Sequence, residues 1–213
     1  MIIDFLKKIS IRKFFILKLW WDQKASFLYQ SGWIKSFRTK KCVDKEGNPI
    51  PWLSNSLNHF LEERLRSDLV MYEYGSGYST LYFAQRIAKV YTIEYDQEWF
   101  NWLAKELPKN VVATYKALED NEYVNNIASI NESFDIIIVD GRRRNECIKA
   151  SLAKLKPNGV IILDDTHREK YQSGYALIEE KGFKKLNFWG FSNGSIDQKC
   201  STLFYRQDNC FGI

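Results

Sequence analysis

The stretch EYGSGYST, residues 73–80, joins an apolar run to an amphipathic one. The apolar run at 69–74 (LVMYEY) predicts a buried strand, and the run at 79–88 predicts a helix. Gly75 and Gly77 let the backbone turn tightly and approach a ligand, while a helix start presents free N–H groups. The stretch therefore predicts a ligand-binding turn between a strand and a helix.

Two residues of this turn bear on the kind of ligand. Thr80 stands where the dinucleotide fingerprint G-x-G-x-x-G has its third glycine, which argues against a pyrophosphate at this helix. Glu73 places a carboxylate two residues before the first glycine, where it would repel a phosphate. A carboxylate at this place suits a cationic ligand instead.

Outward from the turn, short apolar runs alternate with helix-like stretches. The runs are rich in β-branched residues, as in strands that are buried on both faces of a parallel sheet. Predicted strands span 69–74, 90–95, 111–115, 134–140 and 160–165, and predicted helices span 79–88, 97–106, 120–130, 145–155 and 169–181. The runs at 183–191 and 201–206 have no helix between them and predict an antiparallel hairpin. The expected fold class is α/β: a doubly wound, Rossmann-like, mostly parallel sheet with a C-terminal antiparallel hairpin and an N-terminal helical or irregular appendage.

A turn-rich stretch, CVDKEGNPIPW at 42–52, marks a boundary. It predicts an N-terminal appendage at 1–52 and a ligand-binding domain at 53–213, which begins with a helix at 54–66. Residues 1–41 hold ten Lys and Arg but only two acids, so the rest of the chain is mildly acidic although the net charge is +5. The composition, with 45% hydrophobic residues, is otherwise that of an ordinary globular protein.

The basic segment at 1–41 bears on location and partners. Its most apolar run, 11–21, contains three basic residues and is too short to span a membrane, and no signal-peptide cleavage site follows it. Its apolar and aromatic residues recur at helical spacing, which leaves two alternatives: peripheral contact with an anionic membrane surface, or packing on its own domain or on a second copy in a homodimer. Because the remainder is acidic, we expect no nucleic-acid partner. The four cysteines form no metal or disulfide pattern, so we expect a cytoplasmic location, with or without contact to the inner face of the membrane.

Several motifs in chain order resemble the class I S-adenosylmethionine-dependent methyltransferases, over residues 69 to about 206. An acid followed by G-x-G is the family's first motif, and Glu94 ends the second strand, where the family uses an acid to bind both ribose hydroxyls. The run Leu155-Lys-Pro-Asn-Gly159 is similar to the family's L-K-P-G-G turn. The resemblance implies a bacterial methyltransferase with S-adenosyl-L-methionine as its cofactor. It implies cofactor-binding roles for Glu73, Gly75, Ser76, Gly77, Ser79, Thr80, Glu94, Tyr95, Ala117, Leu118 and Asp140.

Three carboxylates follow the fourth and fifth strands. Asp140 ends the fourth strand, and Asp164 and Asp165 end the fifth. Their order is similar to that of the metal-dependent O-methyltransferases of the catechol and macrocin types, which implies that all three hold Mg²⁺ or another divalent cation. Such a cation would lower the pKa of an acceptor hydroxyl. The alternative is that Asp140 bonds substrate, Asp164 caps a helix or bonds backbone N–H groups, and transfer relies on positioning of the acceptor.

A general base is needed to remove the acceptor's proton. Arg143 stands where the catechol type has a lysine, and it cannot lose a proton near neutral pH. His167 lies two residues after the acid pair, and an imidazole can accept a hydroxyl proton at little cost, so it is the candidate base, with Asp140 as the second catalytic residue. A surface histidine is the alternative for His167. The run Arg142 to Arg144 would clamp a phosphate, a carboxylate or a nucleotide-linked sugar, or else form a solvated helix start that pairs with Glu146 and Asp140.

These residues predict transfer of a methyl group to an oxygen of a small-molecule or glycan-type acceptor. Two other functions stay open: a cofactor-binding but catalytically silent partner protein, and an aminopropyl transferase, against which the arginine run argues. Trp52, Tyr78 and Tyr171 are expected near the same rim, either as walls of the site or as packing residues.

Overall fold

The computed structural model describes residues 24–213, and a seven-stranded sheet in the order β3-β2-β1-β4-β5-β7-β6 runs through it. The first five strands are parallel, and β7 pairs antiparallel with both β5 and β6. This sheet confirms the predicted fold class and the C-terminal hairpin. The strands are β1 Val70–Tyr74, β2 Lys89–Glu94, β3 Val111–Tyr115, β4 Phe134–Val139, β5 Leu155–Leu163, β6 Lys184–Gly190 and β7 Lys199–Tyr205.

The strand order reverses between β1 and β4. The chain runs from β1 outward through β2 to β3, then returns to place β4 on the other side of β1. In an open parallel sheet, such a switch point opens a crevice at the carboxyl ends of the two strands. The turn after β1 and Asp140 after β4 therefore lie side by side, because Tyr74 is paired with Val139.

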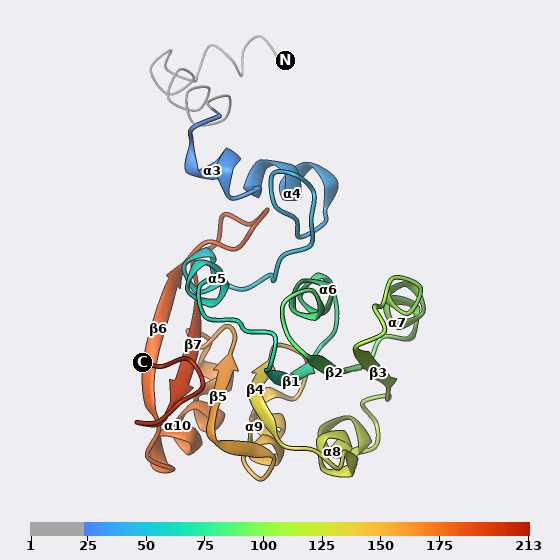
Figure 1. Ribbon diagram of the computed structural model, residues 1–213, viewed down its shortest axis with the longest axis vertical. Helices are drawn as coiled ribbons and strands as arrows, with labels where there is room; N and C mark the ends of the chain where they lie inside the picture. The colour runs from blue at the N-terminus through green and yellow to red at the C-terminus, as the bar shows by residue number, and fades with distance from the viewer. Residues whose placement is uncertain (1–23) are drawn as a thin grey trace.

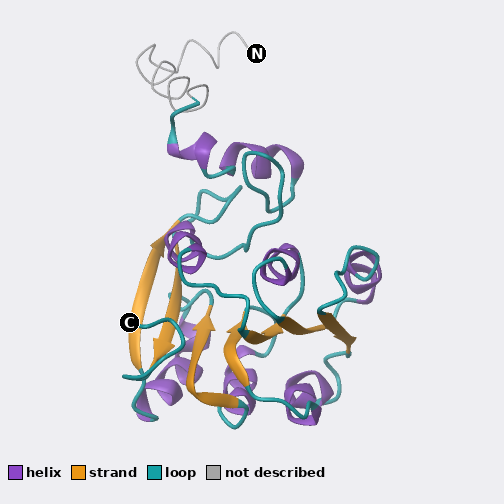
Figure 2. Cartoon of the chain, in the orientation of Figure 1, coloured by secondary structure: helices purple, strands orange, loops and turns teal. Residues whose placement is uncertain are grey.

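Helices cover both faces of the sheet (Figure 1; Figure 2 shows the same view by element type). The helices α5, α6 and α7 lie on one face, and α8, α9 and α10 lie on the other. The observed helices are shorter than the predicted ones, mostly at their C-terminal ends. Their bounds are α5 Asn55–Glu62, α6 Tyr78–Ala84, α7 Gln97–Leu103, α8 Glu122–Ser129, α9 Arg144–Ser151 and α10 Gln172–Glu180, with a 3-10 turn, η1, at Glu169–Tyr171 before α10.

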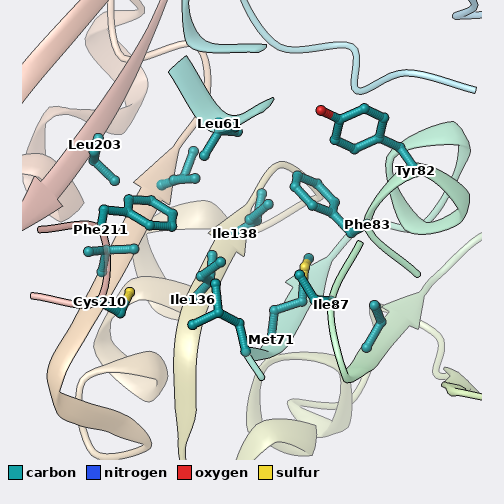
Figure 3. Close-up of a cluster of buried hydrophobic side chains, with 14 of the residues drawn as sticks. Leu61, Met71, Tyr82, Phe83, Ile87, Ile136, Ile138, Leu203, Cys210 and Phe211 are labelled. Atoms are coloured by element: carbon teal, nitrogen blue, oxygen red, sulfur yellow. The ribbon is translucent and has the colours of Figure 1, made fainter. Parts of the chain in front are cut away.

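Two hydrophobic cores fill the spaces between the sheet and its helices. Successive residues of a strand point to opposite faces, so Met71 packs in one core and Tyr72 in the other. Figure 3 shows the first core, in which Met71, Ile136 and Ile138 of the strands meet Phe83 of α6. Because both faces of the central strands are covered, β1 and β4 are almost fully buried and read as apolar runs in the sequence, whereas β6 at the edge of the sheet is largely exposed.

One strand differs from the prediction. Strand β5 begins at Leu155, five residues before the predicted start, and therefore includes the expected turn Leu155 to Gly159. The pairing of β4 with β5 shifts register between Phe134 and Ile136, so this turn-like sequence forms an irregular strand start. A Cβ at Gly159 would lie 2.9 Å from the carbonyl oxygen of Phe134, so a glycine is needed where the two strands approach.

The described part of the appendage is held by the loop between β6 and β7. Two short helices, α3 Phe27–Gln30 and α4 Trp33–Thr39, lie beside that loop (Figure 1). The indole Nε1 of Trp33 donates to the carbonyl oxygen of Ser195 at 2.7 Å, and Asn193 Nδ2 donates to the carbonyl of Val43 at 3.1 Å. Residues 1–23, which carry most of the predicted membrane or dimer contact, lie outside the described residues. Within the described part of the chain, no helix is long and apolar enough to cross a bilayer.

Candidate functional site

The glycine turn after β1 packs directly against the loop after β4. Gly75 has a φ of +90°, and a Cβ built on it would lie 2.8 Å from the Cα of Gly141. A Cβ on Gly141 would in turn lie 2.0 Å from the hydroxyl oxygen of Tyr123. Only glycine fits at both positions, and this close approach brings Asp140 next to the turn.

A cavity of about 440 Å³ opens at this switch point. Gly75, Ser76, Gly77 and Ser79 of the predicted turn line it, together with Glu94, Tyr95 and Asp140. The three predicted rim aromatics also line it: Trp52, Tyr78 and Tyr171. The structure therefore brings together most of the residues that the sequence predicts to bind the cofactor.

Glu94 is held rigidly at the wall of this cavity. Its Oε2 accepts hydrogen bonds from the backbone N–H and the hydroxyl of Ser76, at 3.0 and 3.1 Å, and its Oε1 accepts from the N–H groups of Tyr95 and Asp96. These four bonds fix the carboxylate of a side chain that is 4% exposed. Because the Ser76 hydroxyl can rotate away, a ligand hydroxyl can take its place on Oε2.

Glu73 has a different place from the one predicted. It does not line the cavity but lies behind the turn, 1% exposed, where the hydroxyls of Thr80 and Thr92 donate to its Oε2. Its Oε1 has no hydrogen-bond partner. Burial raises the pKa of Glu73 to about 7. Glu73 and Thr80 thus support the turn from inside, since Thr80 also accepts from the N–H of Gly77.

Two further cofactor predictions fall outside the cavity lining, and several residues that line it were not predicted, among them Lys40, Trp99, Arg168 and Lys170. Ala117 and Leu118 follow β3 but do not line the cavity, so their roles stay predictions. Trp99 of α7 does line it, and its Nε1 donates to the carbonyl oxygen of Ser76 at 2.8 Å. A usable signal was present: Asp96 caps α7 by accepting from the N–H of Trp99, which fixes this helix start beside the turn.

A second cavity, of about 400 Å³, adjoins the first. Trp52, Asp140 and Arg168 line both cavities, so they form the junction between them. The remaining walls come from the ends of the fifth strand and of the hairpin. They are Asp164, Asp165, His167, Ser192, Ser195, Asp197, Gln198 and Lys199.

The three predicted metal ligands already have cationic partners. Arg144 contacts all of them, at 2.9 Å from Asp140, 3.7 Å from Asp164 and 3.4 Å from Asp165. Lys199 Nζ lies 2.7 Å from Asp164 Oδ2 and 3.7 Å from Asp165 Oδ1. Both cations are largely buried, with side chains 8% and 13% exposed.

This arrangement does not fit the predicted divalent cation. Buried carboxylates need opposite charge, and here Arg144 and Lys199 supply it where the metal was expected. Among the described residues, no group of three or more His, Cys, Asp or Glu side chains is arranged to hold a metal ion. The sequence indicates a metal because the three acids follow the fourth and fifth strands. Lys199 belongs to β7, and the sequence does not indicate that this strand brings it to Asp164 and Asp165.

Asp140 and Asp164 differ in their electrostatic surroundings. Burial and the negative charge of Asp164 raise the pKa of Asp140 well above its ordinary value, although Arg144 acts in the opposite direction. Burial alone would raise the pKa of Asp164 too, but Lys199 and Arg144 lower it below its ordinary value. Two acids with pKa values pushed apart suit different tasks, one holding charge and the other exchanging a proton.

His167 lines the second cavity, but its ring geometry does not fit a general base. Its Nδ1 accepts a hydrogen bond from the backbone N–H of Cys200 at 3.2 Å. In the neutral ring the lone pair is then on Nδ1 and the proton on Nε2. His167 can donate a hydrogen bond into the cavity but has no free lone pair there to accept a proton.

The arginine run divides between three environments. Arg142 lines the first cavity and its Nε donates to the hydroxyl of Tyr95 at 3.0 Å. Arg143, with a φ of +51°, points to Glu146 and Asn121 instead. Arg144 is buried in the acid cluster. The predicted three-residue clamp is therefore wrong, because the residues after β4 turn sharply at Arg143 before α9 begins.

Comparison with known proteins agrees with the site. Residues 72–166 match the family model described as a methyltransferase domain. No curated protein matches the chain.

Solved structures resemble the fold at low identity. An O-methyltransferase from Bacillus cereus in complex with SAH is 18% identical, with a TM-score of 0.58 over 69% of this chain and 78% of that one. Precorrin-6y C5,15-methyltransferase from Geobacter metallireducens is 16% identical, with a TM-score of 0.55 over 69% and 86%. A precorrin 8w decarboxylase from Methanobacterium thermoautotrophicum is 20% identical, with a TM-score of 0.54 over 78% and 96%. At these identities the likeness shows the fold alone.

Proposed function

We propose that this chain methylates an oxygen atom of a small or sugar-linked acceptor. The chain belongs to the class I S-adenosylmethionine-dependent methyltransferase superfamily and is a methyltransferase. The observation that carries the proposal is the pair of adjoining cavities with Asp140 at their junction. One cavity suits the cofactor and the other suits the acceptor, so the reacting atoms would meet at Asp140.

The first cavity has features that fit the cofactor. Gly75 lets the turn pack closely beside Asp140 and Gly141 at the cavity wall, and Glu94 presents a fixed carboxylate that suits a ribose diol. Trp99 and Tyr78 supply apolar surface beside Ser76 and Gly77. When bound, S-adenosylmethionine supplies an electrophilic methyl group on a cationic sulfonium.

Asp140 is the proposed general base. It lines both cavities, and its raised pKa brings it closer to the range in which a carboxylate can accept a proton from a hydroxyl. Arg144 holds the carboxylate in place through Oδ1. We propose that Asp140 takes up the proton of the acceptor hydroxyl, while His167 donates a hydrogen bond to the acceptor.

Lys199 is the proposed positioning group for the acceptor oxygen. Its ammonium has three N–H donors, of which one bonds the carbonyl of Trp52 at 2.9 Å and one bonds Asp164 at 2.7 Å. The third remains for the acceptor, and the fixed positive charge would stabilise negative charge that develops on its oxygen. This role replaces the one that a metal ion would have had, and it predicts activity that is indifferent to chelators.

Titration with S-adenosylhomocysteine tests the proposal. We expect the intact chain to bind it, and Glu94→Gln to weaken binding at least ten-fold, about 1.4 kcal/mol, because an amide cannot accept at all the positions that the carboxylate does. Glu122→Gln is the matched control: Glu122 is an exposed acid paired with Lys116, away from the cavity, and its variant should bind as the wild type does. Absence of binding by the intact chain would overturn the proposal.

A catalytically silent partner protein is distinguished by turnover. Such a protein would bind the cofactor without consuming it. The second cavity and its buried Lys199 favour an enzyme, since neither is needed for cofactor binding alone. Formation of S-adenosylhomocysteine in the presence of a screened set of hydroxylated acceptors separates the two.

A further inference from the structure

More Lys and Arg than Asp and Glu side chains line the first cavity. Three of these cations, Lys40, Arg168 and Lys170, come from two distant parts of the chain. Lys40 is at the C-terminal end of α4, while Arg168 and Lys170 belong to the loop and 3-10 turn after β5. Of the three, Arg168 also lines the second cavity and therefore lies at the junction between the two cavities.

These cations have little opposite charge within the described residues. The ammonium groups of Lys40 and Lys170 contact only aromatic rings, Phe37 at 4.6 Å and Tyr171 at 4.9 Å. Arg168 has one ion pair, at 3.3 Å to Asp165, and its side chain is 49% exposed. An aromatic face attracts a cation without neutralising it, so the charge of both lysines stays available to a ligand.

The carboxylates of the same cavity are already engaged. Glu94 accepts four hydrogen bonds, Asp96 caps α7, and Asp140 is paired with Arg144. Five Lys and Arg side chains but only these three acids line the cavity, so the acids do not balance the cations. The first cavity therefore carries a net positive charge.

The cofactor cannot account for this charge. S-adenosylmethionine carries a sulfonium, an ammonium and one carboxylate, so it brings net positive charge into the cavity and has one anionic group to offer. That carboxylate can engage one of the cations. The other cations then lie beside a cofactor of net positive charge, and together they would attract a second anion into the cavity.

We propose that Lys40, Arg168 and Lys170 bind a phosphate or diphosphate group of the acceptor. This inference rests on the proposed function and narrows its substrate class to phosphorylated or diphosphate-linked sugars. Arg168 has donors in a fork geometry that matches two phosphate oxygens, and the two lysines add point charges. The exposed indole of Trp52 at the junction gives a sugar ring a flat apolar surface between the phosphate subsite and Asp140.

Titration of the full chain, saturated with S-adenosylhomocysteine, with inorganic pyrophosphate tests the subsite. We expect saturable binding that weakens as ionic strength rises. In Arg168→Ala/Lys170→Ala, affinity for pyrophosphate should fall at least ten-fold, and by a larger factor than affinity for S-adenosylhomocysteine, whose carboxylate needs only one of the cations. Lys170→Glu alone should abolish most of the binding, and this exposed substitution leaves the ion pair of Arg168 with Asp165 intact.

A matched control removes two positive charges elsewhere. Arg143→Ala/Lys149→Ala changes the net charge equally, but Arg143 points to Glu146 and Lys149 is exposed on α9, away from both cavities. It should bind pyrophosphate as the wild type does. If the control loses as much affinity as the subsite variant, the attraction is only long-range and the inference is wrong.

Two esters distinguish the sources of the diphosphate. UDP-glucose represents a soluble nucleotide sugar, and farnesyl diphosphate represents a polyprenyl carrier. Tighter binding of either one than of pyrophosphate supports the inference and identifies the source. Absence of binding for all three probes overturns it; the proposed function fails separately, if S-adenosylhomocysteine itself does not bind.

Discussion

Replacing Glu73 by Gln should reveal a pH-dependent contribution of this buried acid to stability. Glu73 is 1% exposed, its Oε1 has no hydrogen-bond partner, and its Oε2 accepts from the hydroxyls of Thr80 and Thr92. Water is excluded, so the charged form is disfavoured in the folded state and the pKa of Glu73 rises from 4.5 to about 7. The folded protein therefore holds this proton more tightly than the unfolded chain does.

The sign and size of the effect follow from linkage. Between pH 4.5 and 7 the folded state binds the Glu73 proton and the unfolded state releases it, so the free energy of unfolding falls as pH rises through this window. At about 1.4 kcal/mol per pH unit, the loss amounts to about 3 kcal/mol, and it is complete above pH 7. Gln is uncharged at every pH, and its carbonyl can accept the bonds of Thr80 and Thr92, so the variant lacks this loss.

Urea unfolding of both proteins at half-unit steps from pH 4.5 to 8 measures the effect. The difference in unfolding free energy, Glu73→Gln minus wild type, should rise by about 3 kcal/mol up to pH 7 and then stay level. Other acids titrate equally in both proteins and cancel in the difference. Glu122→Gln, at an exposed acid, should give a difference that does not change with pH. A flat or falling difference for Glu73→Gln would refute the description of Glu73 as a buried, raised-pKa support of the turn.

Four further outcomes are expected. Gly75→Ala should lower the free energy of unfolding by about 1–3 kcal/mol, because φ is +90° and the new Cβ meets Gly141; a loss below 0.5 kcal/mol in urea unfolding would contradict this. Lys199→Met should lower the free energy of unfolding by about 3–5 kcal/mol, since it leaves Asp164 short of a buried partner. The same substitution at a lysine without a buried partner should be nearly neutral. Methyl transfer to an acceptor found by screening should rise with pH through the raised pKa of Asp140, and Asp140→Asn should remove that rise along with most of the rate; a pH profile that the variant retains would exclude Asp140 as the base. Treatment with EDTA should leave the same activity unchanged. A loss of activity that Mg²⁺ restores would contradict the proposal that Lys199, in place of a metal ion, positions the acceptor oxygen.

The order of elements could be predicted because the central strands are mostly apolar on both faces, whereas the helices are not. Runs such as FDIIIVD at 134–140 have no other stable place than a covered sheet. The carboxyl ends of these strands meet at one edge, so Gly75, Glu94 and Asp140 could be placed in one site from the sequence alone. Here the local pattern and the three-dimensional arrangement agree.

The parts that could not be predicted depend on contacts between distant segments. Lys199 reaches Asp164 from a strand that inserts between β5 and β6, and nothing local to Lys199 indicates that insertion. The direction of the ring of His167 depends on a backbone N–H at Cys200. The burial of Glu73 behind the turn, rather than inside the cavity, depends on Thr92 of the neighbouring strand.

A crystal structure of the chain with S-adenosylhomocysteine tests the central claim most directly. We predict that the nucleoside lies in the first cavity with its ribose hydroxyls on Glu94, and that the sulfur points toward Asp140 at the junction with the second cavity. Ligand bound elsewhere, or bound with its sulfur turned away from Asp140, would contradict the assignment of the two cavities.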